Sequence, residues 1–439
     1  MRSKNIVIVV AVLVAFLLGM TSLSIAQKTT ISMSTWGMAW EDFLYTDVII
    51  PQFQKDNPDI KVDFYRYESY FAKLLTLFAG GEAPDVMRGD VTEVGLQSRK
   101  GMLYALDEYI EGPEGVDLDD WSPVPFETLD FVDKVYFLPA GINPYSVLYY
   151  NKDLFNEAGV SYPDYNWTFA DLGSAAKKLT GGGKYGLLWA IPDFVFYTMV
   201  FSEGGQIWDE SKTKCIIDSP EAIKGIKVLQ EWMFDDKFVP MVGSGMLRTT
   251  SYAMFQSGRL GMITEGGWAC PAFKRDAPEL NFARSIFPKA SVDAKSRSGA
   301  GGTGWVMNST TKHPDEAWKF LRALISKEGL LSYWRTTWVE IPARKSVVES
   351  PEFRDIIGIG EKVPGIKTEE EFAEKNQALV DLVKNGWFTQ EMAGPYTSHL
   401  SSFLQTALGE LIGMKRGDVE LALKKFATSV NESIAKEMR

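Results

Sequence analysis

From residue 29 onward, segments in which hydrophobic and polar residues have the period of a strand alternate with segments in which they have the period of a helix. Residues 29–37 and 60–67 alternate between the two types and are rich in β-branched side chains, which predicts two strands. Apolar residues at helical spacing follow each strand, and these helices are expected to end at Asn57 and Gly80. "APDVMRGD" (83–90) then begins another strand. This order predicts an α/β architecture with mostly parallel sheets.

Several predicted helices carry start signals. In 218–233, Ser219 stands at the cap and Pro220 at the first helical position, while in 312–326 Pro314 has the same place. The expected loops are 111–125, 159–167, 291–304 and 355–367.

The first 26 residues have the pattern of a cleaved secretory signal. Arg2 and Lys4 precede an unbroken apolar run, and the small residues of "SIA" (24–26) suit a signal peptidase. The run is short for a membrane span and has no basic stop signal after it. We therefore expect a periplasmic mature chain that begins near Gln27. No cysteine lies near the cleavage site, so no lipid anchor is expected.

Composition narrows the possible partners. The formal net charge is -11, and removal of Arg2 and Lys4 with the signal would make it -13. An acidic surface repels nucleic acid and anionic lipid, so neither is expected as a partner. Aromatic residues make up 13% of the chain, including 13 Trp, which favours surfaces that stack flat ligands as well as cores. Cys215 and Cys270 could form one disulfide or remain two isolated thiols.

Motifs for metals, cofactors and nucleophilic catalysis are weak. The chain has only two histidines and no Cys/His cluster with ligand spacing, so no metal site is predicted. "GAGGTG" (299–304) matches a dinucleotide fingerprint, but "DAKSRS" precedes it and a strand pattern follows, so no cofactor is expected. No G-x-S-x-G elbow is present. A secreted glycosidase needs only two carboxylates and remains an alternative.

Residues 147–159, "VLYYNKDLFNEAG", place several polar groups at one corner. "VLYY" predicts a strand, Asn151 suits the cap of the helix that follows, and Gly159 suits its end. Asp153 falls in the first turn, where a carboxylate favours the helix dipole. Each polar residue thus has a structural role, which makes catalysis here the weaker interpretation.

The same corner carries a family resemblance. "LPAGINPYSVLYYNKDLFNEAGV" resembles the signature of the extracellular solute-binding proteins of sugar ABC transporters, the maltose-binding-protein superfamily. Further segments are similar to that family in the same order, and together they span nearly the whole mature chain. They are 53–64, 73–86, 101–110, 166–180, 251–269 and 313–329.

The resemblance implies the two-lobed periplasmic-binding-protein fold, with two mostly parallel sheets flanked by helices and joined by hinge strands. Lobe 1 would comprise 27–140 and 300–345, and lobe 2 would comprise 141–299 and 346–439. The implied function is capture of a mono- or oligosaccharide by hinge closure, without chemistry on it. A monomer would then deliver the sugar to the membrane permease of an ABC importer. A carrier of a polyamine, peptide or other non-sugar solute is a second alternative.

A sugar site needs flat aromatic faces and hydrogen-bonding groups where strands end at the cleft. The resemblance implies that Trp268 stacks on the sugar and that Asp90 binds hydroxyls, with Arg88 beside it. Asn143 and Tyr145 fall at the crossing into lobe 2, although Pro144 interrupts the family pattern there. The full set of expected ligand-binding residues is Trp36, Trp40, Tyr67, Arg88, Asp90, Asn143, Tyr145, Trp189, Trp268, Gly301, Gly302, Trp305, Trp338 and Arg344.

Overall fold

A computed structural model describes most of the chain after the expected signal, which itself lies outside the described residues. The described residues are 28–37, 39–123, 125–126, 129, 132–241, 247–337, 341–356, 388–389, 394–413 and 415–438. Most of the loop expected at 355–367 also lies outside them, and its first two residues belong to a helix.

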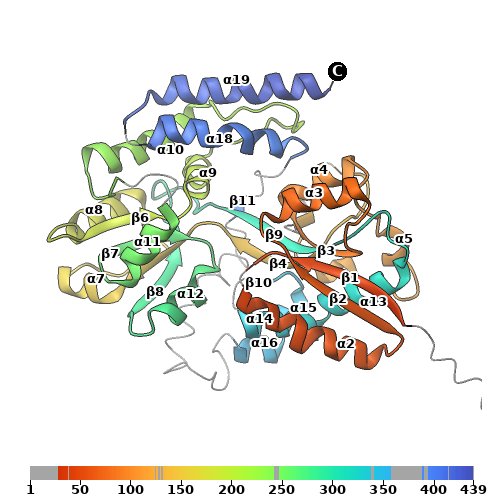
Figure 1. Ribbon diagram of the computed structural model, residues 1–439. Coiled ribbons are helices and arrows are strands. Elements are labelled where there is room, and N and C mark those ends of the chain that lie inside the picture. The colour runs from red at the N-terminus through yellow and green to blue at the C-terminus, as the bar shows by residue number, and fades with distance from the viewer. Residues whose placement is uncertain are drawn as a thin grey trace, which may run out of the picture.

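One half of the molecule is built on a seven-stranded sheet with the order β10-β4-β9-β3-β1-β2, in which β11 also pairs with β9. Figure 1 shows this sheet with helices packed around it, and β4 and β9 running toward the other half. The strands are β1 (Thr29–Thr35), β2 (Ile60–Arg66), β3 (Val86–Asp90), β4 (Leu138–Pro144), β9 (Ser298–Met307), β10 (Ile341–Pro342) and β11 (Phe388–Thr389).

The other half is built on a four-stranded sheet with the order β6-β7-β5-β8. Its strands are β5 (Val147–Asn151), β6 (Tyr185–Trp189), β7 (Leu260–Glu265) and β8 (Phe282–Ile286). Only Tyr145 and Ser146 separate β4 from β5, so the chain passes from one sheet to the other almost without a loop.

Strand pairing is mixed, which corrects the expectation of mostly parallel sheets. β1 runs parallel to β2 and β3, but β9 is antiparallel to both β3 and β4, and β5 is antiparallel to β7 and β8. The reason is that β9 returns from the small-sheet half and enters the large sheet against the direction of β3. The α/β class itself is confirmed, with helices flanking both sheets.

The loop expected at 291–304 is wrong in its second half, because the glycine run lies inside β9. Glycine is a poor strand former on its own. In β9, however, a Cβ on Gly304 would lie 2.2 Å from the carbonyl oxygen of Leu138, and one on Gly301 would lie 1.7 Å from the Tyr145 hydroxyl. Neighbours that approach this closely leave no room for side chains, so tertiary packing explains the glycines.

Helices cover both sheets, and α18 and α19 pack together on the small-sheet half (Figure 1). In the large-sheet half the helices are α2 (Ile50–Asp56), α3 (Tyr70–Gly80), α4 (Val91–Arg99), α5 (Asp107–Ile110), α13 (Pro314–Ile325), α14 (Lys327–Thr337), α15 (Lys345–Val348) and α16 (Pro351–Ile356). In the small-sheet half they are α7 (Lys152–Ala158), α8 (Phe169–Leu179), α9 (Pro192–Ser202), α10 (Pro220–Gln230), α11 (Leu247–Gln256), α12 (Ala269–Asp276), α18 (Thr397–Ile412) and α19 (Val419–Glu437). Short 3-10 or π turns occupy Ala39–Glu41, Leu44–Ile49, Leu118–Asp120 and Glu231–Asp235.

The predicted helix signals are confirmed. The Asn151 side chain accepts hydrogen bonds from the backbone N–H groups of Asp153 and Leu154, both at 3.0 Å, and thereby caps α7. Gly159 ends that helix in the left-handed conformation, with φ of 64°. Ser219 likewise caps α10 by accepting from the Ala222 N–H at 3.2 Å. None of the helices in the described ranges is long and apolar enough to cross a membrane.

Both cysteines are free thiols and both are buried, which resolves the open question of a disulfide. Burial raises the pKa of the Cys215 thiol to about 12. A thiol of that pKa is protonated at neutral pH and is a poor nucleophile.

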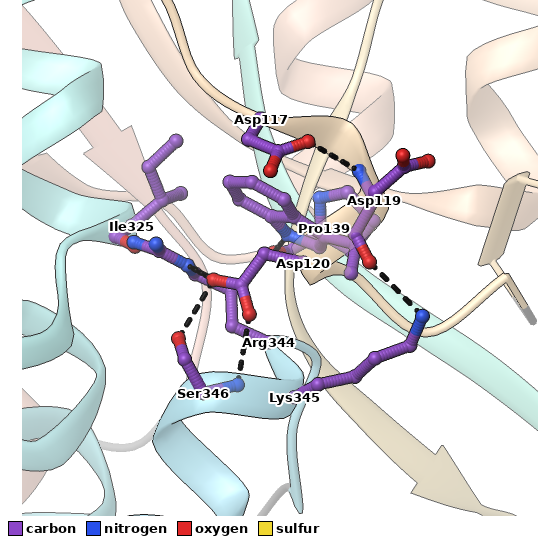
Figure 2. A network of polar contacts seen from close by, with 9 residues as sticks. Asp117, Asp119, Asp120, Pro139, Ile325, Arg344, Lys345 and Ser346 are labelled. Atoms are coloured by element: carbon purple, nitrogen blue, oxygen red, sulfur yellow. Dashed lines mark hydrogen bonds and ion pairs between the residues drawn. The ribbon is translucent and has the colours of Figure 1, made fainter.

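A polar network fixes the segment before Trp121 to the start of α15 (Figure 2). Arg344 donates from Nε to the Asp120 carboxylate at 2.7 Å and packs its guanidinium 4.8 Å from the centre of the Trp121 ring. Ser346 donates to the same carboxylate from its backbone N–H at 2.8 Å and from its hydroxyl at 2.7 Å. The Trp121 indole donates to the Pro139 carbonyl oxygen at 2.8 Å, which connects the network to β4.

We expect Asp120→Asn to reduce the free energy of unfolding by about 1–3 kcal/mol, because it weakens charge-assisted bonds to a partly buried carboxylate. Burial raises the pKa of Asp120, but the bonds from Ser346 and Arg344 outweigh it and hold the pKa below its ordinary value of 3.8. The ionised form therefore favours folding above that pH, and this contribution is lost as the pH falls through the lower folded-state pKa. Urea unfolding should show that the difference in unfolding free energy between the parent and Asp120→Asn is smaller at pH 3 than at pH 7.

The matched control for that prediction is Asp119→Asn, whose exposed side chain takes no part in the network. Equal stability of the Asp120 and Asp119 variants at pH 7 would contradict it.

Candidate ligand-binding cleft

A cavity of about 940 Å³ lies between the two sheet-bearing halves. On the large-sheet side it is lined by residues at the ends of β1, β3 and β4, by the middle of β9 and by α14, and on the small-sheet side by α9, α11, α12 and α18. A hollow of about 1180 Å³ also exists, but it lies outside the large sheet against α2 and α13. Of these two cavities, only the first is lined by aromatic side chains from both halves, and we call it the cleft.

The large-sheet wall of the cleft is organised by Arg88, which is only 4% exposed. Its guanidinium lies 4.5 Å from the centre of the Trp36 ring, and Nη2 donates to the Tyr333 hydroxyl at 2.7 Å and to the Thr303 hydroxyl at 3.3 Å. Nη1 lies 3.8 Å from a carboxylate oxygen of Glu41. These contacts hold the indole of Trp36 as a flat surface with hydrogen-bonding groups beside it.

The small-sheet wall is a cluster of three aromatic rings. Tyr145 and Phe194 stack with centroids 4.4 Å apart and an interplanar angle of 3°. Trp268 meets both edge-on, at 5.7 Å from Phe194 and 6.3 Å from Tyr145. Such a wall offers apolar faces to a flat ligand.

Polar groups lie between the two walls. The Asn143 side chain is 5% exposed, and its Oδ1 has no hydrogen-bond partner among the described residues. A buried unpaired acceptor is costly, so this oxygen suits a donor from a bound solute. Asp90 caps α4 by accepting from the Thr92 N–H at 2.9 Å and also faces the cleft. Burial and the neighbouring charge of Asp90 raise the pKa of Glu93 on the same helix.

Seven of the fourteen residues expected from the sequence line the cleft. They are Trp36, Arg88, Asp90, Asn143, Tyr145, Trp268 and Gly301.

Five of the expected residues lie elsewhere. Trp189 and Trp305 are buried in the core, at 2% and 3% exposure, because each points from its strand into a packed layer. Tyr67 packs with Tyr65 in an aromatic group beside α3, and Gly302 faces Pro125. Arg344 is held by Asp120 in the network described above. Trp338 and the side chain of Trp40 lie outside the described residues.

Sequence reasoning missed several cleft residues that come from helices. Examples are Phe194 and Tyr197 on α9, Arg248 and Tyr252 on α11, and Tyr333 on α14. α9 is apolar on all sides, so periodicity gives no sign of which face meets the cleft.

Residues 40–330 of the chain match the family described as bacterial extracellular solute-binding protein. The chain belongs to this family. The cleft has the position and the convergent polar groups that are expected of the ligand site in a solute-binding protein.

Individual relatives of this solute-binding protein are distant. It is 24% identical over 314 residues to a maltotriose-binding protein from Pyrococcus abyssi, a match that spans 70% of this chain and 65% of the relative. A maltodextrin-binding protein from Bacillus subtilis is 26% identical over 313 residues, which span 68% and 70% of the two chains. An ABC substrate-binding protein from Listeria monocytogenes, solved in complex with cycloalternan, superposes with a TM-score of 0.76 at 24% identity, over 93% of this chain and 99% of that one. The fold is thus that of the two-lobed solute-binding proteins.

Proposed function

We propose that this solute-binding protein captures a sugar in the cleft and delivers it to the permease of an ABC importer, with no chemistry on the sugar. The observation that carries the proposal is the pair of opposed aromatic walls, Trp36 on one side and Tyr145, Phe194 and Trp268 on the other, with Arg88 and other polar groups between them. Sugar rings have apolar faces and a rim of hydroxyls, and this combination matches both.

The relatives support the same ligand class, because their names specify maltotriose, maltodextrin and cycloalternan. A cleft of about 940 Å³ is near the upper end of ordinary ligand sites. We therefore favour an oligosaccharide over a monosaccharide.

We further propose that binding involves hinge closure between lobe 1 (27–140 and 300–345) and lobe 2 (141–299 and 346–439). These predicted bounds need one adjustment, because α15, α16 and the end of β4 pack with the large sheet and therefore belong with lobe 1. A ligand that touches both walls binds the closed state better and shifts the population toward it. Two contacts cross between the lobes at one edge: Arg99 at the end of α4 lies 3.5 Å from Glu437 of α19, and its guanidinium lies 5.1 Å from the centre of the Tyr396 ring. A smaller radius of gyration by X-ray scattering with sugar bound would be expected, and an unchanged radius would argue against closure.

The proposal places the mature protein in the periplasm without a lipid anchor, after cleavage following Ala26. The mass of the exported chain tests this directly, because an acylated or uncleaved product would be heavier than the chain that begins at Gln27.

Thermal unfolding against a panel of mono-, di- and trisaccharides, with polyamines and peptides as controls, tests the ligand class. A true ligand at a hundredfold over its dissociation constant should stabilise the protein by roughly 2.7 kcal/mol. Stabilisation by a sugar that is recovered intact supports a carrier. Stabilisation by a control compound alone would overturn the sugar assignment, and release of hydrolysis products would favour the glycosidase alternative.

A further inference from the structure

Glu265 is a buried carboxylate directly behind the small-sheet wall of the cleft. It is the last residue of β7 and is 1% exposed. Its Oε1 accepts a hydrogen bond from the Gly266 N–H at 3.0 Å, whereas Oε2 has no hydrogen bond in the described part of the chain and lies 3.6 Å from Arg248 Nε. Burying a carboxylate opposes folding even beside a cation, so packing alone does not explain this residue.

Glu265 fixes the turn that carries Trp268. A Cβ on Gly266 would lie 2.2 Å from the Trp268 ring, so the indole rests on the backbone of this turn. The Tyr149 hydroxyl donates to the carbonyl oxygens of Gly266 and Gly267, at 2.9 and 3.1 Å. The Glu265 carboxylate and the Tyr149 hydroxyl thus both hold the turn, and the turn sets the position of the Trp268 ring.

The same carboxylate faces α11, which lines the cleft. Arg248 lies with its guanidinium 5.5 Å from the centre of the Tyr252 ring, and both side chains reach the cleft. Besides these two groups, the Trp268 indole faces Glu265, and its Nε1 is also buried without a hydrogen bond among the described residues. Behind the turn, Arg284 of β8 donates to the Gly267 carbonyl oxygen at 3.4 Å.

We propose that Glu265 is a positioning residue of the cleft, which in its ionised form holds Arg248 and the Trp268 turn in the geometry that binds solute. The inference rests on the proposed function only in that the cleft binds a solute. Burial raises the pKa of Glu265 to about 7, although Arg248 and the Gly266 N–H oppose that rise. Solute affinity is therefore expected to fall as the pH drops through neutrality.

Stability should change in the opposite direction. Because the folded-state pKa lies above the ordinary value of 4.5, the contribution of Glu265 to stability is fully present below that value and is lost as the pH rises through about 7. This trend in stability follows from the raised pKa alone. Positioning is distinguished from structural support by a pH dependence of affinity, and of the Trp268 indole, that Glu265→Gln abolishes.

The experiment compares the full mature chain with Glu265→Gln and with Glu279→Gln, a control at an exposed position in the loop before β8. Without any ligand, the indole ¹⁵N–¹H resonance of Trp268, assigned by its loss in Trp268→Phe, is followed from pH 5.5 to 8.5. We expect a shift with a midpoint near pH 7 in the parent and the control, and none in Glu265→Gln. A resonance that does not move in the parent would overturn the proposal.

The second readout is the affinity for maltotriose at pH 8 and pH 6. We expect it to fall at least about fivefold in the parent and the control, and to be weak and independent of pH in Glu265→Gln. A variant that binds with the parent's affinity and pH profile would overturn the inference. If maltotriose binds to none of the proteins, the sugar proposal fails on this probe, while the indole titration still decides the role of Glu265.

Discussion

Arg88→Met should reduce the free energy of unfolding by about 3–5 kcal/mol, because it removes a cation that its surroundings require. The Arg88 side chain is 5% exposed and lies 3.8 Å from Glu41, whose side chain is 12% exposed. Methionine fills much of the volume but leaves the Glu41 carboxylate buried without this charge and removes the bond to the Tyr333 hydroxyl. Urea unfolding of the ligand-free protein measures the loss.

Two variants make this result specific. Arg99→Met removes a partly exposed cation whose ion pair with Glu437 should contribute about 1 kcal/mol or less. The double variant Arg88→Met with Glu41→Gln should lose less stability than the sum of the single variants, because it no longer buries a carboxylate that has lost the Arg88 cation. Strict additivity would show that the two residues do not interact.

Trp268→Ala should weaken sugar binding by about thirtyfold or more, because it removes the largest ring of the small-sheet wall. Truncating an aromatic residue at the centre of a binding site typically costs about 2 kcal/mol or more, and each 1.4 kcal/mol is a factor of ten in affinity. Trp268 packs edge-on against Phe194 and Tyr145, so its loss also frees their orientation. Calorimetric titration measures the effect.

Trp268→Phe is the matched control, since it keeps an apolar face in the wall and should retain most of the affinity. Urea unfolding of both variants would separate lost binding from lost stability. Parent-like affinity in Trp268→Ala would exclude this ring from the site.

The parts of the fold that could be predicted are those determined by residues close to one another in the sequence. A cap such as Asn151 and a terminator such as Gly159 act within a few residues, so the sequence alone indicates where α7 begins and ends. The glycine-rich first part of β9 was mistaken for a loop because glycines are poor strand formers, and the neighbours that require them, Leu138 and Tyr145, lie more than 150 residues away.

The cleft could be predicted only where its residues follow strand ends in the family pattern. Trp268 and Asp90 were found in this way. Tyr333 could not be predicted as a cleft residue, because its place beside Arg88 depends on a contact across 245 residues of chain. Trp189 and Trp305 share the residue type of the cleft tryptophans but point into the core, a difference that their surroundings alone reveal.

The most direct test of the central claim is calorimetric titration of the mature protein with maltotriose and longer maltodextrins, with analysis of the recovered sugar. We predict one binding event per chain, a negative heat-capacity change from burial of apolar ring faces, and intact sugar afterwards. Parallel titration of Trp268→Ala should show the loss stated above. Equal binding by the parent and Trp268→Ala, or conversion of the sugar to shorter products, would contradict a carrier that holds sugar between these two aromatic walls.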